Sequence, residues 1–282
     1  MSLTVDIIGQ GHHADVRRQA VEAWAGRAAV EQLRPEAPSG GAVPPPPADH
    51  WRGVDVAFVA VPTADHYRIA EAATKHGVHV FLEWPPATSL RECRSIVQLA
   101  EEAGVEVGVS RPLRYHALFD ALGDARVQLI TLRHEVGRDT LAFWPPRCAE
   151  ALDLCCALAQ SHGVDRIDAE AVPRNVAWPE ALAFALRFQS GTYAQVSLAR
   201  RARPAGYTGA VVGPRIQLEA DLAADAVYQE GRRAKAPDDR SLVERETAAF
   251  LEAIAQGRVP PVTVLDGLHT MRLAERLMAR LR

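Results

Sequence analysis

The sequence predicts an α/β protein of two domains: an N-terminal Rossmann-like parallel sheet, and a C-terminal α+β domain whose open sheet is mostly antiparallel. A glycine-rich turn from Gly9 to Ala14 separates a short apolar strand from a helix. Between Asp55 and Pro86, a strand, a helix and a second strand make one βαβ unit, which joins parallel strands. In the second half, extended segments follow one another and helices close the chain, a succession typical of an α+β domain.

Length and composition set the outer limits of this prediction. The chain has 282 residues, more than one compact core usually supports, so we divide it into a dinucleotide-binding domain, 1–112, and a domain for substrate and oligomerisation, 113–282. A net charge of −3 gives no basic surface for nucleic acid, and no apolar run reaches the roughly 20 residues that cross a bilayer. Without a secretory leader or a metal-binding cysteine spacing, we expect a reduced cytoplasmic protein.

The first candidate site is the turn after the opening strand, Val5–Ile8. The turn reads GxGxxA between a strand and a helix, which is the context of a dinucleotide fingerprint. Gly9 permits the tight turn, Gly11 lets the backbone approach a pyrophosphate, and Ala14 allows the helix to pack closely. The alternative is a glycine-rich turn that binds nothing, in which the two histidines are simply exposed. The residues that we predict to contact the dinucleotide here are Gly9, Gln10, Gly11, His12, His13 and Ala14.

The segment after the second strand, Ala28–Leu33, departs from a standard Rossmann unit. An NAD site usually has an acidic residue near the end of this strand, which accepts from the ribose 2′-hydroxyl. Arg34 stands there instead, and it favours the 2′-phosphate of NADP unless it is an ordinary surface arginine. The crossover, 36–51, includes Pro44–Pro47, which exclude a helix interior and a central strand. We therefore predict a shortened, irregular crossover that reshapes the adenosine end of the site.

The βαβ unit supplies the next candidates. Its first strand, Val54–Val61, ends at Pro62, and the helix that follows ends at Gly77. Its second strand, Val78–Leu82, runs directly into the loop Glu83–Pro85. Parallel sheets bind their ligands beyond the carboxyl ends of the strands. The cofactor-binding residues that we place at this edge are Val61, Pro62, Thr63, His66, Glu83, Trp84 and Pro85, with Arg111 after the next strand.

The second half predicts a sheet with helices on one face only. A capping box is expected at the start of two helices, one at Ser89 and Glu92 in the first domain and one at Ser241 and Glu244 in the second. The free sheet face predicts a homo-oligomer, a dimer or tetramer formed through the C-terminal sheet. The predicted elements are a strand over 126–136, a helix over 145–159, a hairpin of 181–189 and 192–199, extended chain over 209–222, and helices over 241–256 and 263–281.

Several stretches resemble one oxidoreductase family over nearly the whole chain. They are the GxGxxA turn at Gly9, the run from Asp55 to Thr63 followed by His66, and the run from Gly77 to Pro85. Their order is similar to that of the Gfo/Idh/MocA family, named after glucose–fructose oxidoreductase, inositol dehydrogenase and rhizopine catabolism. The resemblance implies a Rossmann domain that binds NAD or NADP, and a second domain whose open sheet forms an oligomer. It also implies small-molecule substrates such as sugars, inositols and related alcohols.

Two signatures of the resembled family are altered in this chain. Family members have Glu-Lys-Pro where this chain has Glu83, Trp84 and Pro85, and their lysine, near the nicotinamide, exchanges a proton or orients the substrate hydroxyl. Tryptophan has no titratable group for this task. The second signature is an Asp, a His and another Asp on a helix start; alignment on Asp153 puts Glu150 at the histidine and a proline at the first aspartate. The resemblance thus implies a degenerate site without the usual Lys, Asp and His.

Other side chains are candidates for the missing acid–base chemistry. Glu150 and Asp153 share a face of one predicted helix and can form an acid–base pair. Alternatively, Asp153 makes a structural salt bridge and Glu150 lies on a solvated surface. Tyr115 and His116 can donate a proton, or they merely turn the chain into the next helix. Trp84 can stack on the nicotinamide or on an aromatic substrate, or it only fills the cleft.

Three functions fit these residues. The first is an NAD(P)-dependent oxidoreductase, with NADP slightly preferred, that reduces a C=O or C=N bond of a small metabolite without the usual catalytic set. The second is non-redox chemistry, such as elimination, cyclisation or isomerisation, with Glu150 as the base. The third is a catalytically silent binding or regulatory subunit. We favour the first, because two features of a cofactor site are retained. They are the glycine-rich turn Gly9–Ala14, here called the phosphate turn, and the edge loops 61–66 and Glu83–Pro85 at the carboxyl end of the strands.

Overall fold

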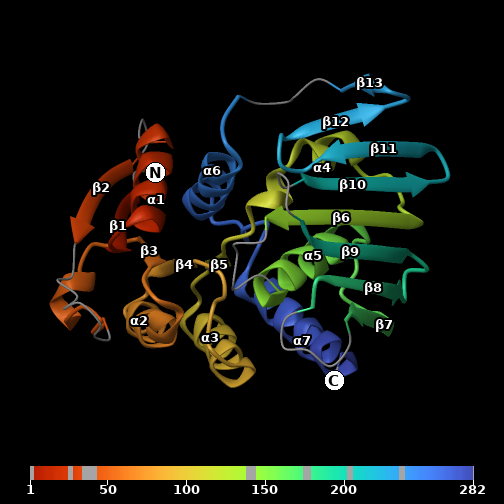
Figure 1. Cartoon of the computed structure of the whole chain (residues 1–282). Helices are drawn as coiled ribbons and strands as arrows, with labels where there is room; N and C mark the ends of the chain where they lie inside the picture. The colour runs from red at the N-terminus through yellow and green to blue at the C-terminus, as the bar shows by residue number, and fades with distance from the viewer. Residues whose placement is uncertain are drawn as a thin grey trace. The chain divides into compact units, whose positions relative to one another are not determined.

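The computed structural model shown in Figure 1 describes residues 3–24, 28–33, 43–137, 144–173, 179–201, 206–234 and 239–281. The chain forms two compact units. Unit 1 comprises Met1–Pro112 and Arg240–Leu268, and unit 2 comprises Leu113–Asp239 and His269–Arg282. The first division coincides with the end of the predicted N-terminal domain. Residues 240–268, however, which the sequence assigned to the C-terminal domain, belong to unit 1.

The sheet of unit 1 has five parallel strands in the order β2-β1-β3-β4-β5, which confirms the predicted Rossmann-like sheet. Strand β3 is buried along its whole length, and this explains its continuous apolar sequence. The strand order reverses between β1 and β3, and open α/β sheets bind their ligands at such a switch point. The strands are β1 (Leu3–Gly9), β2 (Ala28–Leu33), β3 (Val56–Ala60), β4 (His79–Leu82) and β5 (Val107–Val109).

The helices of unit 1 begin where the sequence offers caps. The Ser89 side chain accepts from the backbone N–H of Glu92 and starts α3. The carboxylate of Glu92 accepts from the N–H of Thr88 rather than from that of Ser89, so this capping box differs from the predicted one. The complete box forms at Ser241 and Glu244, where α6 begins. The helices are α1 (His12–Trp24), α2 (Thr63–Lys75), α3 (Leu90–Ala103) and α6 (Leu242–Ala255).

Helix α6 belongs to unit 1 because its apolar residues complete the core of the parallel sheet. Phe250 is 1% exposed, and its ring lies edge-on to those of Phe58 on β3 and Phe81 on β4, with centroids 5.9 and 5.0 Å away. The helix also lies against α1. Because α6 follows the strands of unit 2 along the chain, sequence order alone placed it in the C-terminal domain.

The crossover from β2 to β3 is irregular, as the prolines predict. In its described part, residues 43–55, the only regular element is the 3-10 turn η1 (Ala48–Trp51). A polar contact fixes this turn, because His50 Nε2 lies 2.7 Å from the carboxylate of Asp6, which is 1% exposed on β1. Arg34, on which the NADP preference was based, lies outside the described residues.

The sheet of unit 2 has eight strands in the order β13-β12-β11-β10-β6-β9-β8-β7. Neighbours are antiparallel except β6 and β9, so the predicted, mostly antiparallel sheet is confirmed. The predicted hairpin joins β8 to β9. The strands are β6 (Leu129–Gly137), β7 (Val164–Val172), β8 (Ala181–Phe188), β9 (Tyr193–Arg201), β10 (Gly206–Gly213), β11 (Ile216–Asp221), β12 (Ala226–Gln229) and β13 (Arg232–Arg233).

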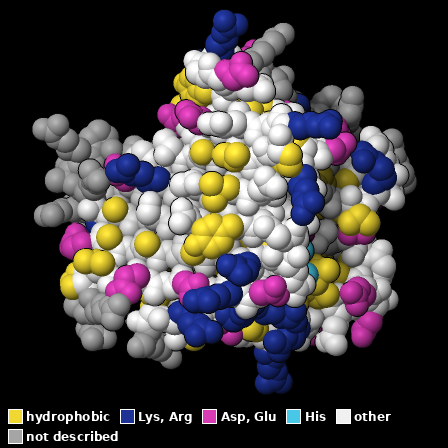
Figure 2. Space-filling view, turned by 90° about the vertical axis from the view of Figure 1, so that its right-hand side faces the viewer, with side chains coloured by type: hydrophobic (Ala, Val, Ile, Leu, Met, Phe, Trp, Pro, Cys, Tyr) yellow, Lys and Arg dark blue, Asp and Glu magenta, His cyan; other side chains and the backbone are white. Residues whose placement is uncertain are grey.

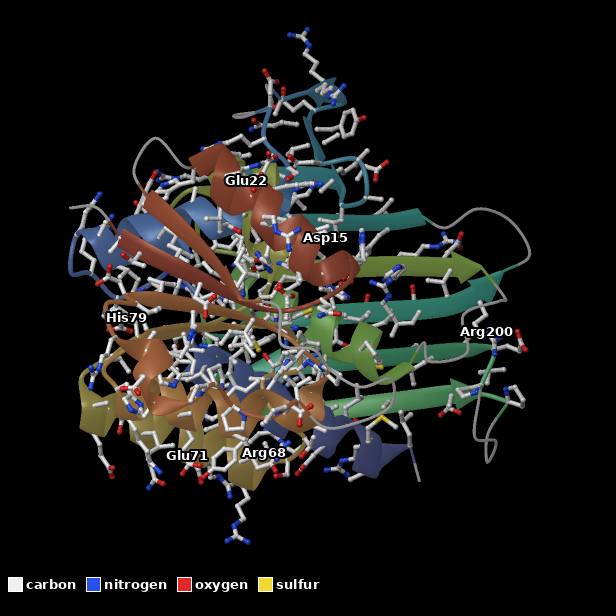
Figure 3. The ribbon with its side chains drawn as sticks, turned by 90° about the vertical axis from the view of Figure 1, so that its left-hand side faces the viewer. Asp15, Glu22, Arg68, Glu71, His79 and Arg200 are labelled. Carbon is white, nitrogen blue, oxygen red and sulfur yellow. The ribbon has the colours of Figure 1, made fainter. Side chains whose placement is uncertain are left out.

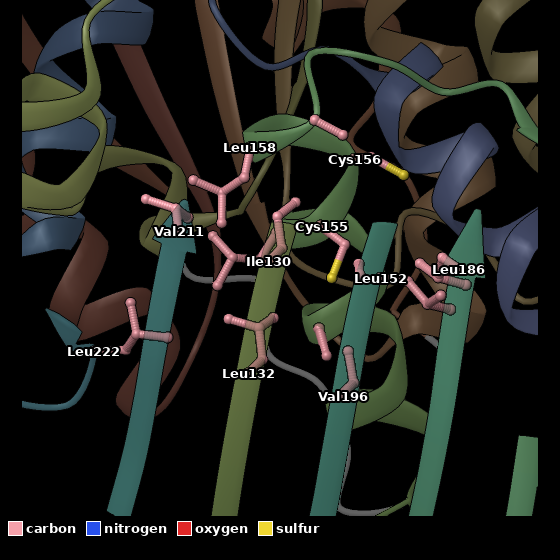
Figure 4. Packing of buried hydrophobic residues seen from close by; sticks show 14 of the residues in the cluster. Ile130, Leu132, Leu152, Cys155, Cys156, Leu158, Leu186, Val196, Val211 and Leu222 are labelled. Atoms are coloured by element: carbon pink, nitrogen blue, oxygen red, sulfur yellow. The ribbon is translucent and has the colours of Figure 1, made fainter. Parts of the chain in front are cut away.

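One face of this sheet carries the core of unit 2. In Figure 4, Leu152 and Cys155 of α5 lie against Ile130 of β6 and Val196 of β9. Every second residue of β8 is buried in the same core, because side chains along a strand alternate between the two faces. The helices of unit 2 are η2 (Pro112–Tyr115), α4 (Ala117–Leu122), α5 (Trp144–Leu158) and the greater part of α7 (Val264–Arg280).

The opposite face of the sheet is open within unit 2. Thr131, Ala183 and Gln195 line a shallow hollow on it, and the larger apolar side chains of Leu129 and Tyr193 are 37% and 36% exposed. On the side of the molecule that Figure 2 presents, hydrophobic side chains gather in the middle, with arginine and lysine side chains below them. No helix in the described parts of the chain is long and apolar enough to cross a membrane.

Candidate active site

The glycine-rich turn lies at the switch point between β1 and β3. Gly9 ends β1 with a φ of +137°, and a Cβ at this position would overlap the carbonyl group of Ala60 at the end of β3. Only glycine therefore fits there. Gly11 has a φ of +86°, and a Cβ added to it would meet no atom within 4 Å. The space in front of Gly11 is open, so a ligand can approach the backbone closely.

Helix α1 starts directly after this turn. Asp15, labelled in Figure 3, donates its backbone N–H to the carbonyl of Gly11 at 3.0 Å, which is the first bond of the helix. Gln10, His12 and His13 are exposed, whereas Ala14 is fully buried. The N–H groups that precede this first bond are unpaired within the helix, and they fit the phosphates of a dinucleotide.

His66 holds together the loops that follow β3 and β4. It is 1% exposed, with Nδ1 2.9 Å from the carbonyl oxygen of Pro85 and Nε2 3.0 Å from that of Val61. Burial lowers the pKa of His66, while these two carbonyls and the Glu83 carboxylate act in the opposite direction. The ring is thus enclosed between the predicted cofactor loops, which it positions. Pro62 and Thr63 lie beside it at the start of α2.

A buried arginine that the sequence did not single out lies at the centre of unit 1. The side chain of Arg17 on α1 is 3% exposed, and Nε lies 2.5 Å from Glu83 Oε1 while Nη2 lies 2.6 Å from Glu246 Oε2. The guanidinium also donates to Ser110 Oγ at 2.7 Å and to Thr247 Oγ1 at 3.0 Å. Burial by itself lowers the pKa of Arg17, but the two carboxylates raise it well above its ordinary value. Burial raises the pKa of Glu246, which Arg17 opposes.

Trp84 and Arg111 form a stacked pair at the same sheet edge. The guanidinium carbon of Arg111 lies 3.2 Å from the centroid of the Trp84 ring. Arg111 is 6% exposed and its backbone N–H donates to the Glu246 carboxylate, whereas Trp84 is partly exposed. The structure therefore brings together two predicted cofactor residues, Trp84 after β4 and Arg111 after β5. The carboxylate of Glu83 points inward to Arg17 and is 16% exposed, so it is a structural partner more than a ligand-binding group.

A second group of titratable side chains lies in unit 2, around Glu150 on α5. The Glu150 carboxylate accepts from Arg147 at 3.2 Å, and His134 Nδ1 lies 3.9 Å from Glu150 Oε1. The ring of His134 stacks on that of Tyr207, its partner across β6 and β10, with centroids 4.0 Å apart. Burial and the Arg147 charge lower the pKa of His134 to about 4, so its imidazole is neutral near pH 7. Burial also raises the pKa of Tyr207 well above its ordinary value.

The other predicted acid–base residues are engaged in structural contacts. Asp153 is 3% exposed and accepts two hydrogen bonds from Arg114, at 2.8 and 2.9 Å, and one from Thr270 at 3.2 Å. This is the structural salt bridge that the sequence left open as the alternative. His116 is fully buried; its Nδ1 accepts from the N–H of Leu118 and caps α4. Tyr115 is partly exposed in η2.

Comparison with known proteins relates the N-terminal part of the chain to a protein family. The model of the Gfo/Idh/MocA family, described as an oxidoreductase family with an NAD-binding Rossmann fold, matches residues 8–111. Over this range the chain is similar to the family. The matched range contains the phosphate turn, both edge loops and Arg111. Among curated proteins, the 1,5-anhydro-D-fructose reductase of Ensifer adhaerens is 27% identical over 248 aligned residues, which cover 77% of this chain and 74% of that protein.

Solved structures of similar proteins share the fold of the whole chain. The UDP-N-acetylglucosamine 3-dehydrogenase GnnA of Acidithiobacillus ferrooxidans has a TM-score of 0.83 at 18% identity and covers 100% of this chain and 98% of its own. The aldose–aldose oxidoreductase of Caulobacter crescentus has a TM-score of 0.74 at 19% identity, with coverages of 100% and 98%. GenD2 of gentamicin A biosynthesis, solved with NAD, has a TM-score of 0.75 at 18% identity, with coverages of 99% and 94%. At these identities the similarity shows the fold.

We predict that the buried Arg17 network is needed for the stability of unit 1. Arg17→Met leaves two carboxylates without their cation, and breaking a buried ion pair on one side costs about 3–5 kcal/mol of unfolding free energy. Urea unfolding followed by tryptophan fluorescence measures this loss. Arg52→Met is the control, because the Arg52 side chain is 84% exposed and its ion pair with Asp49 lies on the surface. Equal urea midpoints for Arg17→Met and the wild type would contradict the prediction.

We also predict a pH dependence of stability that originates at His134. The unfolded chain binds a proton at the ordinary pKa of 6.5, whereas the folded chain binds it at about 4. The contribution of the neutral imidazole is therefore complete above pH 6.5 and is lost as the pH falls towards about 4, by about 2–3 kcal/mol. His134→Gln should have a shallower decline than the wild type, while the control His76→Gln, at an exposed histidine, should not. Parallel curves for His134→Gln and the wild type would refute this assignment.

Proposed function

We propose that this protein is an NAD(P)-dependent oxidoreductase that reduces a C=O or C=N bond of a small metabolite. The observation that carries the proposal is the turn at the switch point, where only glycine fits at Gly9 and open space lies before Gly11. A turn that served packing alone would need no open approach to the first N–H groups of α1. The match of residues 8–111 to a family with an NAD-binding Rossmann fold supports the same assignment.

The residues of unit 1 fit a nicotinamide dinucleotide, which supplies or accepts a hydride when it is bound. The N–H groups from Gly11 to His13 would hold its pyrophosphate. The loops after β3 and β4, which His66 fixes through the carbonyls of Val61 and Pro85, would position its nicotinamide end. NADP remains slightly favoured over NAD on the position of Arg34 alone.

The reduction also needs a proton donor, since the hydride adds to carbon and a proton adds to oxygen or nitrogen. Trp84 cannot provide this proton, and the arginine that stacks on it stays charged at all physiological pH values. Asp153 and His116 are held in structural contacts. We therefore retain Glu150, whose side chain is 28% exposed beside Arg147 and His134, as the acid–base candidate, with Tyr115 as the second choice.

The alternative function is non-redox chemistry, such as elimination or isomerisation, with Glu150 as the base. The observation that favours it is the cluster of Glu150, neutral His134 and Tyr207 in unit 2, combined with a tryptophan in place of the family lysine. A neutral histidine beside a carboxylate suits proton abstraction whether or not a hydride is transferred. Cofactor binding separates this alternative from the reductase.

We predict that the purified protein binds NADPH or NADH, with an increase in nicotinamide fluorescence on titration. Gly11→Val should weaken this binding by about tenfold or more, because the new side chain fills the space that the phosphates need. Gly53→Val is the matched control: Gly53 also has a positive φ, +78°, and an open surrounding, but it lies outside the turn. Failure to bind either dinucleotide at millimolar concentration would remove the reductase and leave the non-redox enzyme or the silent subunit.

We further propose that the open face of the unit 2 sheet forms a homodimer or homotetramer. Leu129 and Tyr193 are the exposed apolar side chains of β6 and β9 that such an interface would cover. Sedimentation velocity should show an oligomer for the wild type, which Tyr193→Glu should dissociate at the same protein concentration. Val259→Glu, at a 69% exposed residue of unit 1, should leave the oligomer intact. A wild-type monomer would exclude the proposed interface.

A further inference from the structure

The stacked pair of Trp84 and Arg111 places a permanent positive charge at the carboxyl edge of the parallel sheet. Trp84 follows β4 and Arg111 follows β5, and the guanidinium carbon lies 3.2 Å from the indole centroid. Arg111 is 6% exposed and Trp84 is partly exposed, so the indole is the part of the pair that a ligand can touch. A guanidinium this close to an indole face makes a strong cation–π contact.

The backbone around the pair is fixed on both sides. Before Trp84, the carboxylate of Glu83 accepts from Arg17 at 2.5 Å; after it, the carbonyl of Pro85 lies 2.9 Å from His66 Nδ1. The Arg111 backbone N–H donates to Glu246, a fully buried carboxylate. Because Glu83, the Pro85 carbonyl and the Arg111 N–H are held by polar contacts, the backbone that carries the indole and its cation is preorganised. Preorganisation of this kind makes a fixed charge effective.

Two carboxylates and a second guanidinium lie beside the pair. The carboxylates of Glu83 and Glu246 both contact the guanidinium of Arg17, at 2.5 and 2.6 Å. The cation that contacts the indole is Arg111. Arginine guanidinium groups keep their proton over the physiological pH range. The electrostatic field at the indole therefore includes a positive charge that does not titrate.

A nicotinamide ring changes its charge when it is reduced. The oxidised ring is a pyridinium cation, and the reduced ring is a neutral dihydropyridine. A nearby fixed cation repels the first and leaves the second almost unaffected. We propose that the Trp84–Arg111 pair makes the cofactor site bind the reduced dinucleotide more tightly than the oxidised one. The inference rests on the proposed function, since it requires a nicotinamide ring at this sheet edge.

The size of the effect follows from the separation of the two charges. With the indole between them, a ring stacked on Trp84 would lie roughly 7 Å from the guanidinium, where two unit charges at an effective dielectric constant of 20 to 80 change an equilibrium about 3-fold to 50-fold. We therefore expect Arg111 to increase the preference for binding the reduced form by about tenfold. Such a site loads with reduced cofactor and releases the oxidised form readily, which suits a reductase and leaves the overall reaction equilibrium unchanged.

The experiment compares the dissociation constants of the reduced and the oxidised cofactor. It uses NADPH and NADP, or NADH and NAD, whichever pair the wild type binds more tightly. Isothermal titration calorimetry should give the wild type a tighter constant for the reduced form. In Arg111→Gln, the dissociation constant of the oxidised form divided by that of the reduced form should fall about tenfold. In Arg111→Lys, which keeps the positive charge, this ratio should stay close to the wild-type value. The control Arg68→Gln, on the outer side of α2 (Figure 3), should leave the ratio unchanged.

Titration with ADP-ribose, which has the phosphates but no nicotinamide, separates the possible failures. An unchanged ADP-ribose affinity in Arg111→Gln shows that this variant is folded and that its phosphate turn is intact. Equal wild-type affinity for the two redox forms, or an unchanged ratio in a folded Arg111→Gln, would overturn the inference and leave the oxidoreductase standing. If the wild type binds neither ADP-ribose nor either redox form, the proposed function itself fails, and this inference fails with it.

Discussion

The structure of unit 1 depends on the burial of one guanidinium. Arg17 comes from the helix that follows the phosphate turn, and its partners come from the loop after β4, the end of β5 and the helix α6. A buried guanidinium is tolerated only where its donors are matched by acceptors, and two carboxylates and two hydroxyls provide this match. These four segments therefore have one mutual arrangement, and the sheet edge that carries the candidate cofactor loops is fixed by it. The same contact explains why α6 belongs to unit 1.

The network also decides which side chains of the edge remain for a ligand. The Glu83 carboxylate accepts from Arg17, and both ring nitrogens of His66 lie within hydrogen-bond distance of backbone carbonyls. Trp84 is left as the partly exposed group, with Arg111 behind it. Neither side chain exchanges protons near neutral pH, since an indole has no such group and a guanidinium keeps its proton. Trp84 and Arg111 can therefore orient a ligand and supply charge, but they cannot transfer a proton.

Much of the fold could be predicted because its signals are local. Apolar runs, the cap at Ser89 and a glycine-rich turn marked the domain of the parallel sheet, and alternation marked the strands of unit 2. The Arg17–Glu246 contact could not be predicted, because its residues are 229 positions apart and helical charges are normally exposed. The burial of His134 could have been predicted. On its strand, His134 lies on the same face as the buried Ile130 and Leu132, so its side chain points into the core. The packing of α6 in unit 1 could not be predicted from its position, because it follows the strands of unit 2 along the chain.

Under the proposed function, Trp84 and Arg111 would influence the chemistry at the sheet edge through charge. If reduced cofactor binds about tenfold tighter, linkage raises the potential of the bound two-electron couple by about 30 mV, so the bound reductant is slightly weaker. The same cation stabilises negative charge that develops on a carbonyl oxygen, or on the nitrogen of a neutral imine, as the hydride is added. It repels an iminium ion for the reason that it repels the oxidised ring. If the protein is the proposed reductase, a neutral, electron-poor C=O or C=N bond would gain most from Arg111, and a protonated imine would gain least.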